Sequence, residues 1–288
     1  MAVERRSVSL TLGAILVVVA LLSVLPFAWI ICGSFKPHLE IQRGNVWPWQ
    51  AYEVEKPAGQ FVTLDNYRKI ADKLSGLPTY YFNTVYLAMA GTLLSLLVGS
   101  LAAYGLAQFR FAGNKLLFTL LLLTIMIPGE VTLIGQYELM FKLRLYDRIA
   151  GLLAAYTAGN LLLVIFIMRN VFLSIPQDLV DAAMIDGAGT WRVFWDLMVP
   201  IGRNGLAACA ILTFLGIWNE FLFALTFTST EAVRTLPVGI TLLKGQWGLF
   251  NSGVLFATVL LSFLPIVIVF VLLQKYFVRG LSAGAIKA

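Results

Sequence analysis

Six long apolar stretches alternate with polar segments along the chain. Each is about as long as a helix that crosses a bilayer, which takes roughly 20 mainly apolar residues. The third stretch carries Glu130 and the fifth carries Glu220, whereas the other four contain no acidic residue. The stretches cover residues 10–31, 82–107, 116–137, 149–172, 205–227 and 254–277. This pattern predicts an all-α, polytopic membrane protein with six transmembrane helices.

The first apolar stretch is predicted to be a retained helix. It follows two arginines and is uncharged over residues 7–35. A secretory signal peptide has a shorter apolar region and a cleavage site of small residues, and neither is evident here. The next segment, residues 34–80, contains four prolines, mixed charges and the tryptophans Trp47 and Trp49. These features predict an aqueous loop whose aromatic residues lie at the membrane interface.

Composition supports the membrane assignment. Of the 288 residues, 59% are hydrophobic and only 12% are charged, and the mean hydropathy is +0.85. A soluble domain carries about 25% charged residues, so this chain has too few charges to solvate a globular surface. The net charge of +6 comes from residues between the apolar stretches, which favours anionic lipid headgroups over nucleic acid as their partner.

The distribution of lysine and arginine leaves the orientation open. Six spans place both termini on the same side of the membrane. If that side is the cytoplasm, ten of the 21 cationic residues lie inside and eleven outside, six of them in residues 34–80. The positive-inside rule compares such numbers, and here they are nearly equal.

The second apolar stretch has small residues at every fourth position. Residues at this spacing lie along one face of a helix, where small side chains let a neighbouring helix approach closely. The alternative is coincidence in a helix rich in glycine and alanine. The residues concerned are Gly91, Ser95, Gly99, Ala103 and Ala107.

The polar segment between the fourth and fifth stretches is predicted to form a short helix. Ser174 and Gln177 have the spacing of a capping box, and Pro176 suits a first helical turn. Gly187 and Gly189 then predict the helix end. Thr190 is positioned to cap a second helix, and Pro200 is predicted to open the fifth span. Small residues allow close approach, so the helix suits docking into a groove on another protein. An amphipathic helix lying on the membrane surface is the open alternative.

The same segment resembles the EAA loop of ABC importer permeases. That motif has Glu-Ala-Ala, a glycine six residues after the glutamate, and a hydrophobic-x-hydrophobic-Pro ending. Here Asp181 stands in the place of the glutamate, which keeps the charge and shortens the reach, while Gly187 has the expected spacing. The residues to which the resemblance assigns coupling are Asp181, Ala182, Ala183, Asp186, Gly187, Ala188 and Pro200.

Other parts of the chain are similar to the maltose-type carbohydrate branch of this family, and the similarity covers roughly residues 80–288. The matching stretches are residues 103–111, 217–221, 234–238 and 274–285. The resemblance implies a type I ABC importer permease fold with its core at residues 81–278 and its coupling loop at 174–203. It also implies a companion permease subunit, a dimer of ATP-binding subunits and an extracytoplasmic sugar-binding protein.

The resemblance also implies an orientation in a bacterial or archaeal inner membrane. ATP is cytosolic, so the coupling loop faces the cytosol and both termini are cytoplasmic. Residues 1–35 are then the N-terminal tail and first helix, 36–80 an extracytoplasmic loop and 279–288 a cytoplasmic tail. The dipeptide Gly-Lys, which a Walker A loop requires, occurs nowhere in the chain. We therefore expect ATP and magnesium on the partner ATPase, and no cofactor, metal site or catalytic residue on this chain.

Polar residues inside apolar stretches are candidates for lining the cargo pathway. Glu130 follows Pro128, where the third helix is predicted to kink, and an aromatic ring beside hydrogen-bonding groups suits a sugar. Each could instead lie near the outer interface or bond to a neighbouring helix. The candidates are Glu130, Gln136, Asn160, Trp218, Asn219 and Glu220.

Other functions remain as alternatives. A permease for polyols or glycerol phosphates is close in class, but a phosphate cargo favours cations at membrane depth, and no stretch has one in its middle. A secondary transporter usually shows internal repeats, and none is evident. A membrane-embedded enzyme needs clustered histidines, cysteines or carboxylates, whereas this chain has one histidine, His38, and two cysteines.

Overall fold

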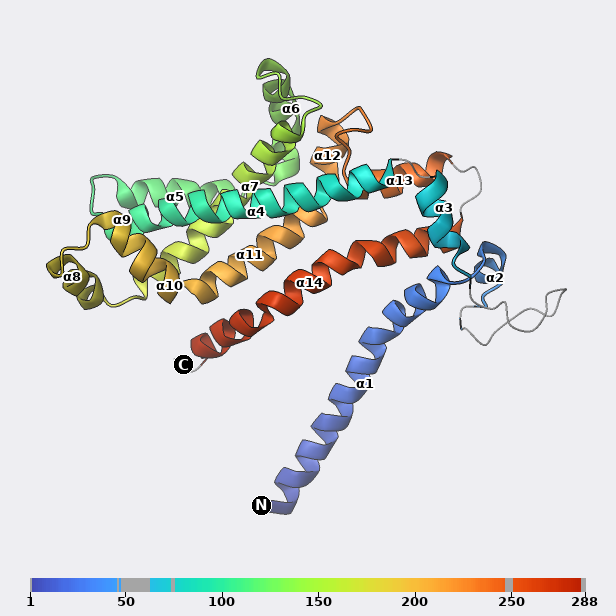
Figure 1. The fold of residues 1–288 in the computed structure, drawn as a ribbon. Coiled ribbons are helices and arrows are strands. Elements are labelled where there is room, and N and C mark those ends of the chain that lie inside the picture. Colours follow the sequence, from blue (N-terminus) through green and yellow to red (C-terminus); the bar gives the residue numbers. More distant parts are fainter. Residues whose placement is uncertain (1, 46, 48–62, 74–75, 247–250, 286–288) are drawn as a thin grey trace. The chain divides into compact units, whose positions relative to one another are not determined.

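The computed structural model describes residues 2–45, 47, 63–73, 76–246 and 251–285. These residues form helices joined by turns and short loops, and none of them lies in a β-strand (Figure 1). The helices, in chain order, are α1 (Ala2–Ser34), α2 (His38–Gln42), α3 (Asp65–Lys73), α4 (Leu77–Gln108), α5 (Asn114–Ile125), η1 (Gly129–Thr132), α6 (Leu133–Lys142), α7 (Ile149–Leu173), α8 (Gln177–Ile185), α9 (Thr190–Arg192), η2 (Val193–Met198), α10 (Val199–Ile201), α11 (Arg203–Trp218), α12 (Leu222–Phe227), α13 (Leu236–Gln246) and α14 (Ser252–Ala285).

Two compact units make up the chain. One comprises Met1–Leu77 and Ile240–Leu264, and the other comprises Pro78–Gly239 and Pro265–Ala288. Most of the residues that the sequence singles out, including the whole coupling loop, lie in the second unit.

In the first unit, α1 packs against the first half of α14. Gly33 lies against the ring of Phe256, and Phe27 meets Phe263 edge-on at 5.5 Å between ring centroids. His38 on α2 accepts a hydrogen bond at Nδ1 from the N–H of Ser252, at 3.0 Å. The single histidine therefore holds two chain segments together.

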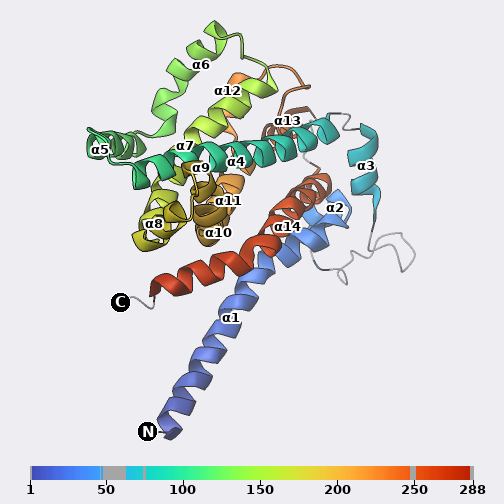
Figure 2. The same ribbon diagram turned by 60° about the vertical axis from the view of Figure 1, so that its left-hand side comes forward.

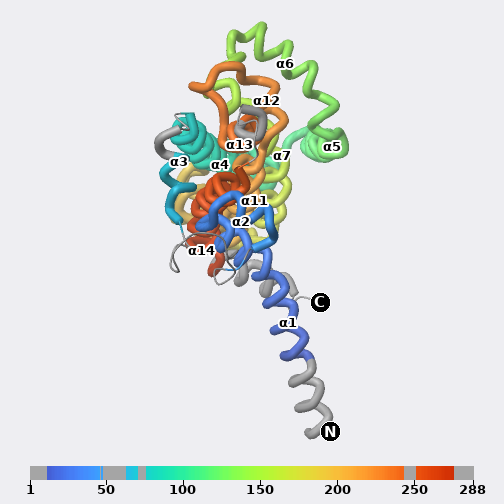
Figure 3. The backbone as a smooth tube through the Cα atoms, turned by 90° about the vertical axis from the view of Figure 1, so that its right-hand side faces the viewer, coloured from blue at the N-terminus to red at the C-terminus, as the bar shows by residue number. Residues whose placement is uncertain are grey.

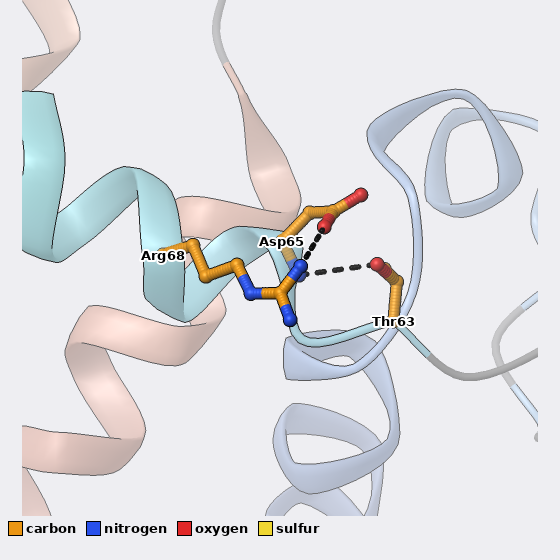
Figure 4. Close-up of polar contacts among 3 residues, drawn as sticks. All are labelled: Thr63, Asp65 and Arg68. Carbon is orange, nitrogen blue, oxygen red and sulfur yellow. Dashed lines mark hydrogen bonds and ion pairs between the residues drawn. The ribbon is translucent and has the colours of Figure 1, made fainter.

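The start of α3 shows how residues 34–80 are ordered where the structure describes them. The hydroxyl of Thr63 accepts a hydrogen bond from the N–H of Asp65 at 3.1 Å, and Asp65 pairs with Arg68 at 3.7 Å (Figure 4). Asn66 donates to the carbonyls of Ser34 and Lys36, each at 2.8 Å. The predicted loop thus contains two short helices, α2 and α3, while Trp49 lies outside the described residues.

The small-residue stripe of α4 organises the second unit. Gly91, Ser95, Gly99 and Ala103 are all buried, which confirms the packing face predicted from their spacing. A Cβ at position 91 would lie 2.8 Å from a methyl group of Ile217 on α11. The same stripe meets α7, where the Ser95 hydroxyl donates to the carbonyl of Thr157 at 3.4 Å. Short side chains on α4 therefore bring two helices close to it.

Two further candidate spans are pairs of helices with a bend between them. Within the described residues, four helices are long and apolar enough to cross a membrane, and the number rises to six if each of two bent pairs is one span. The first pair joins α5 to η1 and α6 with a bend of 93°, visible where α6 turns away from α5 in Figure 3. This break confirms the kink predicted at Pro128. The second pair joins residues 190–201 to α11 with a bend of 77°.

The prediction of one continuous fifth helix over residues 205–227 is wrong. α11 ends at Trp218, and a separate helix, α12, begins at Leu222. The carboxylate of Glu220 accepts hydrogen bonds from the N–H groups at the start of α12, so the backbone begins a new helix there. The sixth predicted span, by contrast, continues as α14 to Ala285, beyond the predicted end at residue 277.

We expect Gly99→Ala to lower the midpoint of thermal unfolding of the purified protein in detergent. The added Cβ would lie 2.6 Å from Cγ1 and 2.8 Å from Cβ of Val164, a branched side chain with one preferred rotamer in a helix. Overpacking of this kind costs about 1–3 kcal/mol. The matched control is Gly105→Ala on the same helix, where nothing lies within 4 Å and alanine favours the helix. Equal midpoints would contradict the close approach.

Candidate coupling loop and pathway residues

The helix α8 begins differently from the sequence prediction. Pro176 precedes it as the N-cap, without a side-chain capping bond, so the predicted capping box of Ser174 and Gln177 is wrong. The hydroxyl of Ser174 donates to the carbonyl of Val171 at 2.7 Å, because Ser174 ends the preceding helix α7. Gln177 donates to Oδ1 of Asp181 at 3.1 Å. Asp181 therefore makes its contact within α8.

The end of α8 is a Schellman motif. The N–H of Gly187 donates to the carbonyl of Met184 at 3.0 Å, and that of Ala188 donates to Ala183 at 2.9 Å. This pattern requires a left-handed backbone between the two donors, and Gly187 has a φ of +84° with nothing within 4 Å of a Cβ built there. The predicted helix end at Gly187 is confirmed, and its physical reason is the positive φ.

One side chain anchors α8 to the rest of the second unit. Val180 is fully buried in an apolar cluster that includes Phe172, Phe194 and Met198. Ala183 and Ala188 are partly buried against the same cluster, so these two small residues face inward. Asp181, Ala182, Asp186 and Gly187 are exposed. The predicted coupling residues are therefore divided between an inner and an outer face.

The outer face of α8 carries large apolar residues that the sequence prediction missed. Ile185 is 86% exposed, and Leu179 and Met184 are each about half exposed. Exposed apolar residues of this kind are typical of a surface that contacts another protein or a membrane. The helical period could have identified them, because Leu179 and Ile185 do not share the buried face of Val180.

The segment after α8 links it to α4 and α11. The hydroxyl of Tyr104 on α4 donates to the carbonyl of Thr190 at 3.1 Å. Thr190 is the first residue of α9 rather than its cap, which is Gly189.

The π-helical turn η2 follows α9. This helical form is rare overall but frequent at functional sites. Pro200 lies in α10, before the bend into α11, and so does not open the fifth span as predicted. Figure 2 shows α8, α9 and α10 grouped at one end of this unit.

Three of the pathway candidates lie around the junction of α11 and α12. Glu220 accepts hydrogen bonds from the N–H groups of Phe223 and Ala224, at 2.7 and 3.0 Å, and from the hydroxyl of Tyr156 at 2.7 Å. Trp218 is 3% exposed and packs between Phe214 and Tyr81. Asn219 is exposed and donates to the carbonyl of Leu215 at 2.9 Å. Glu220 and Trp218 thus have structural partners within the chain.

The other three candidates lie on three elements, α7, η1 and α6. Asn160, one turn after Tyr156 on α7, donates to the Tyr156 carbonyl at 2.8 Å. Glu130 is exposed on η1, and Gln136 on α6 donates to the hydroxyl of Thr132 at 2.8 Å. Gly129, which precedes Glu130, lies beside the ring of Phe223 on α12. A role of these residues in cargo transport stays a prediction.

A second hydrogen-bonded connection holds α12 beside the start of α7. Oδ1 of Asp147 accepts hydrogen bonds from the N–H groups of Ser229 and Thr230, at 2.8 and 3.0 Å, and its own N–H donates to the carbonyl of Phe227 at 2.9 Å. Desolvation raises the pKa of the Asp147 carboxyl, but the hydrogen bonds from Thr230 and Ser229 outweigh it and leave the pKa below its usual value. The ionised carboxylate of Asp147 therefore stabilises the folded state.

Comparison with known proteins decides the family. Residues 95–283 match the model of the binding-protein-dependent transport system inner membrane component. The chain belongs to this family. It is 34% identical over 270 residues to the arabinooligosaccharides transport system permease protein AraQ of Halalkalibacterium halodurans, with 93% of each chain covered. It is 33% identical to the trehalose/maltose transport system permease protein MalG of Thermococcus litoralis, over 98% of this chain and 97% of that one.

Solved structures give the fold of this inner membrane component. A chain from the crystal structure of a bacterial ABC transporter involved in the import of the acidic polysaccharide alginate aligns with a TM-score of 0.78 at 23% identity, covering 94% of this chain and 97% of that chain. The resemblance to ABC importer permeases that the coupling loop suggested is therefore confirmed, together with the predicted all-α fold. Family membership also removes the secondary transporter from the alternatives.

We expect Glu220→Ala to destabilise this membrane component more than Asn219→Ala. The first variant loses an acceptor for three hydrogen bonds, whereas the exposed Asn219 side chain bonds only to the preceding turn. Losing a helix cap costs about 0.5–2 kcal/mol. Thermal unfolding in detergent, followed by circular dichroism, measures the difference. An unfolding curve for Glu220→Ala like that of the wild type would point back to cargo binding for the carboxylate.

We expect Asp147→Asn to destabilise the protein at neutral pH and to approach the wild type in acid. Because the folded-state pKa of Asp147 lies below its unfolded value of 3.8, its charge stabilises the fold above that pH, and the effect is lost as the pH falls through the folded value. Unfolding midpoints at about pH 7 and about pH 3 test this linkage. Asp178→Asn, at an exposed carboxylate, is the charge-matched control. A pH-independent difference between Asp147→Asn and the wild type would contradict it.

Proposed function

We propose that this chain is a permease subunit of an ATP-driven, binding-protein-dependent carbohydrate importer. It forms half of the translocation pathway with a companion permease subunit. A dimer of cytosolic ATP-binding subunits supplies the energy, with ATP and magnesium on those chains, and an extracytoplasmic binding protein delivers the cargo.

The observation that carries the coupling proposal is the two-sided burial of α8. Its inner face is anchored by Val180, so α8 moves with the bundle. On its outer face Ile185 and Leu179 are exposed. Apolar side chains of this kind on a short helix can insert into a groove on a partner protein. Because the inner face of α8 packs against the bundle and its outer face is free to bind the ATPase, a movement of the ATPase can be transmitted to the membrane helices.

The orientation follows from where ATP is found. The partner ATPase works in the cytosol, so α8 and the turns at its end of the second unit face the cytosol. With six membrane crossings, both termini are then cytoplasmic and residues 36–80 are extracytoplasmic. The bent pairs are counted as spans in this proposal, as their length and composition allow.

The carbohydrate cargo is supported by the relatives. Permeases named for arabinooligosaccharides, for trehalose and maltose, and for diacetylchitobiose align with at least 93% of this chain. Neutral sugars also suit the apolar stretches, which have no cation in their middle. In the proposed cycle, ATP closes the ATPase dimer, α8 moves with it, and the bundle exchanges inward-facing and outward-facing states whose balance the loaded binding protein shifts.

We expect Ile185→Ser to reduce co-purification of the ATP-binding subunit with this chain and to abolish ATP-driven uptake. Loss of a central apolar anchor weakens a protein interface by about 2 kcal/mol or more, or roughly 30-fold in affinity. Because Ile185 is 86% exposed, the substitution leaves the permease folded. Affinity purification of the co-expressed transporter, followed by uptake into proteoliposomes, measures both effects.

The matched control is Ile134→Ser on α6, which makes the same change at a residue that is 79% exposed and distant from α8 in Figures 1 and 2. It should retain the full amount of ATPase. Normal co-purification and normal uptake in Ile185→Ser would overturn the coupling role of the outer face of α8.

A further inference from the structure

A groove of about 620 Å³ lies where α4 ends, α5 begins and α7 ends, within the second unit. These ends are on the side of the unit that carries α8, because α8 follows α7 after three residues. The coupling loop and the pathway candidates are not among the residues that line it. It is therefore a separate feature of the chain.

The groove is cationic. Arg110, Lys115 and Arg169 line it, and no acidic residue does. Within the described part of the chain, none of the three forms an ion pair with a carboxylate. Three cations with no internal counterion create a site for an anion.

Arg169 shows that the site is partly built. Its guanidinium lies 4.0 Å from the ring centroid of Phe118 on α5, which fixes its position by a cation–π contact. Its Nε is buried and has no hydrogen-bond partner among the described residues. A buried donor without an acceptor is unfavourable, so an acceptor from a bound molecule would stabilise it.

The rest of the lining is apolar and open to the surroundings. Phe109 and Phe111 are about half exposed, and Leu116 and Leu173 are at least as exposed. The first turn of α5 also borders the groove, through Asn114 and Lys115, and the N-terminus of a helix favours negative charge. The groove thus combines an anion site with an adjoining apolar wall.

We propose that this groove binds the phosphate of an anionic phospholipid. The cations and Nε of Arg169 hold the phosphate, and the exposed leucines and phenylalanines contact the first part of the acyl chains. Basic pockets between membrane helices on the cytoplasmic side have this chemistry. A free phosphate would satisfy the cations but leave the apolar wall in water. The assignment to the cytoplasmic leaflet rests on the proposed orientation of α8; the binding itself does not.

Lipid binding to the purified transporter, co-expressed with its partner subunits, tests the proposal by native mass spectrometry. The probes are dioleoyl phosphatidylglycerol, dioleoyl phosphatidylcholine and inorganic phosphate. The variant is Arg110→Gln with Lys115→Gln, both exposed residues whose loss leaves the fold intact. The charge-matched control is Lys142→Gln with Arg148→Gln, exposed cations before α7.

We expect the wild type and the control to prefer phosphatidylglycerol over phosphatidylcholine. The groove variant should lose affinity for phosphatidylglycerol by about fivefold for each cation removed, which corresponds to about 1 kcal/mol per cation near a charged surface. Arg169→Gln should lose at least about fivefold in affinity for phosphatidylglycerol, because it removes one cation and also the buried donor.

Three results would overturn the proposal. They are equal affinity for the two lipids, equal losses in the groove and control variants, and displacement of the lipid by inorganic phosphate at millimolar concentration, which would make free phosphate the occupant. The measurement needs neither ATP hydrolysis nor cargo. Its failure therefore leaves coupling through α8 untouched, and a failure of the Ile185→Ser test leaves the lipid result standing.

Discussion

Close approach of α4 to α7 and α11 is the constraint on which the second unit depends. Two glycines and a serine on one face of α4 leave no room for larger side chains, as the distance from position 99 to Val164 shows. In a bilayer, burial of apolar surface does not drive helices together, so association relies on packing at short range. The stripe therefore fixes which helices are neighbours.

This packing gives the coupling loop a firm base. Because α4 and α7 are held together, Tyr104 reaches the carbonyl of Thr190, and Phe172 forms part of the cluster that takes up Val180. Both ends of the loop are thereby tied to the bundle. The π-helical turn and the bend before α11 follow Thr190 along the chain, so they connect this loop to α11.

Polar groups within or beside the apolar stretches serve mainly to shape the backbone in this structure. Glu220 starts α12 and binds Tyr156, and Asp147 connects the start of α7 to the end of α12. Intramembrane carboxylates are often functional. The carboxylate of Glu220, however, already accepts three hydrogen bonds from groups of this chain. Among the pathway candidates, Asn219 and Glu130 have exposed side chains.

The sequence by itself determined the helical class, the packing face of α4, the kink at Pro128 and the glycine that ends α8. Each of these follows from local spacing or from the backbone preference of one residue type. Only the tertiary structure decided that residues 205–227 break into two helices and that Ser174 ends α7 instead of opening α8. Those outcomes depend on which partner a side chain meets across the bundle, such as Tyr156 for Glu220, and no local pattern encodes that partner.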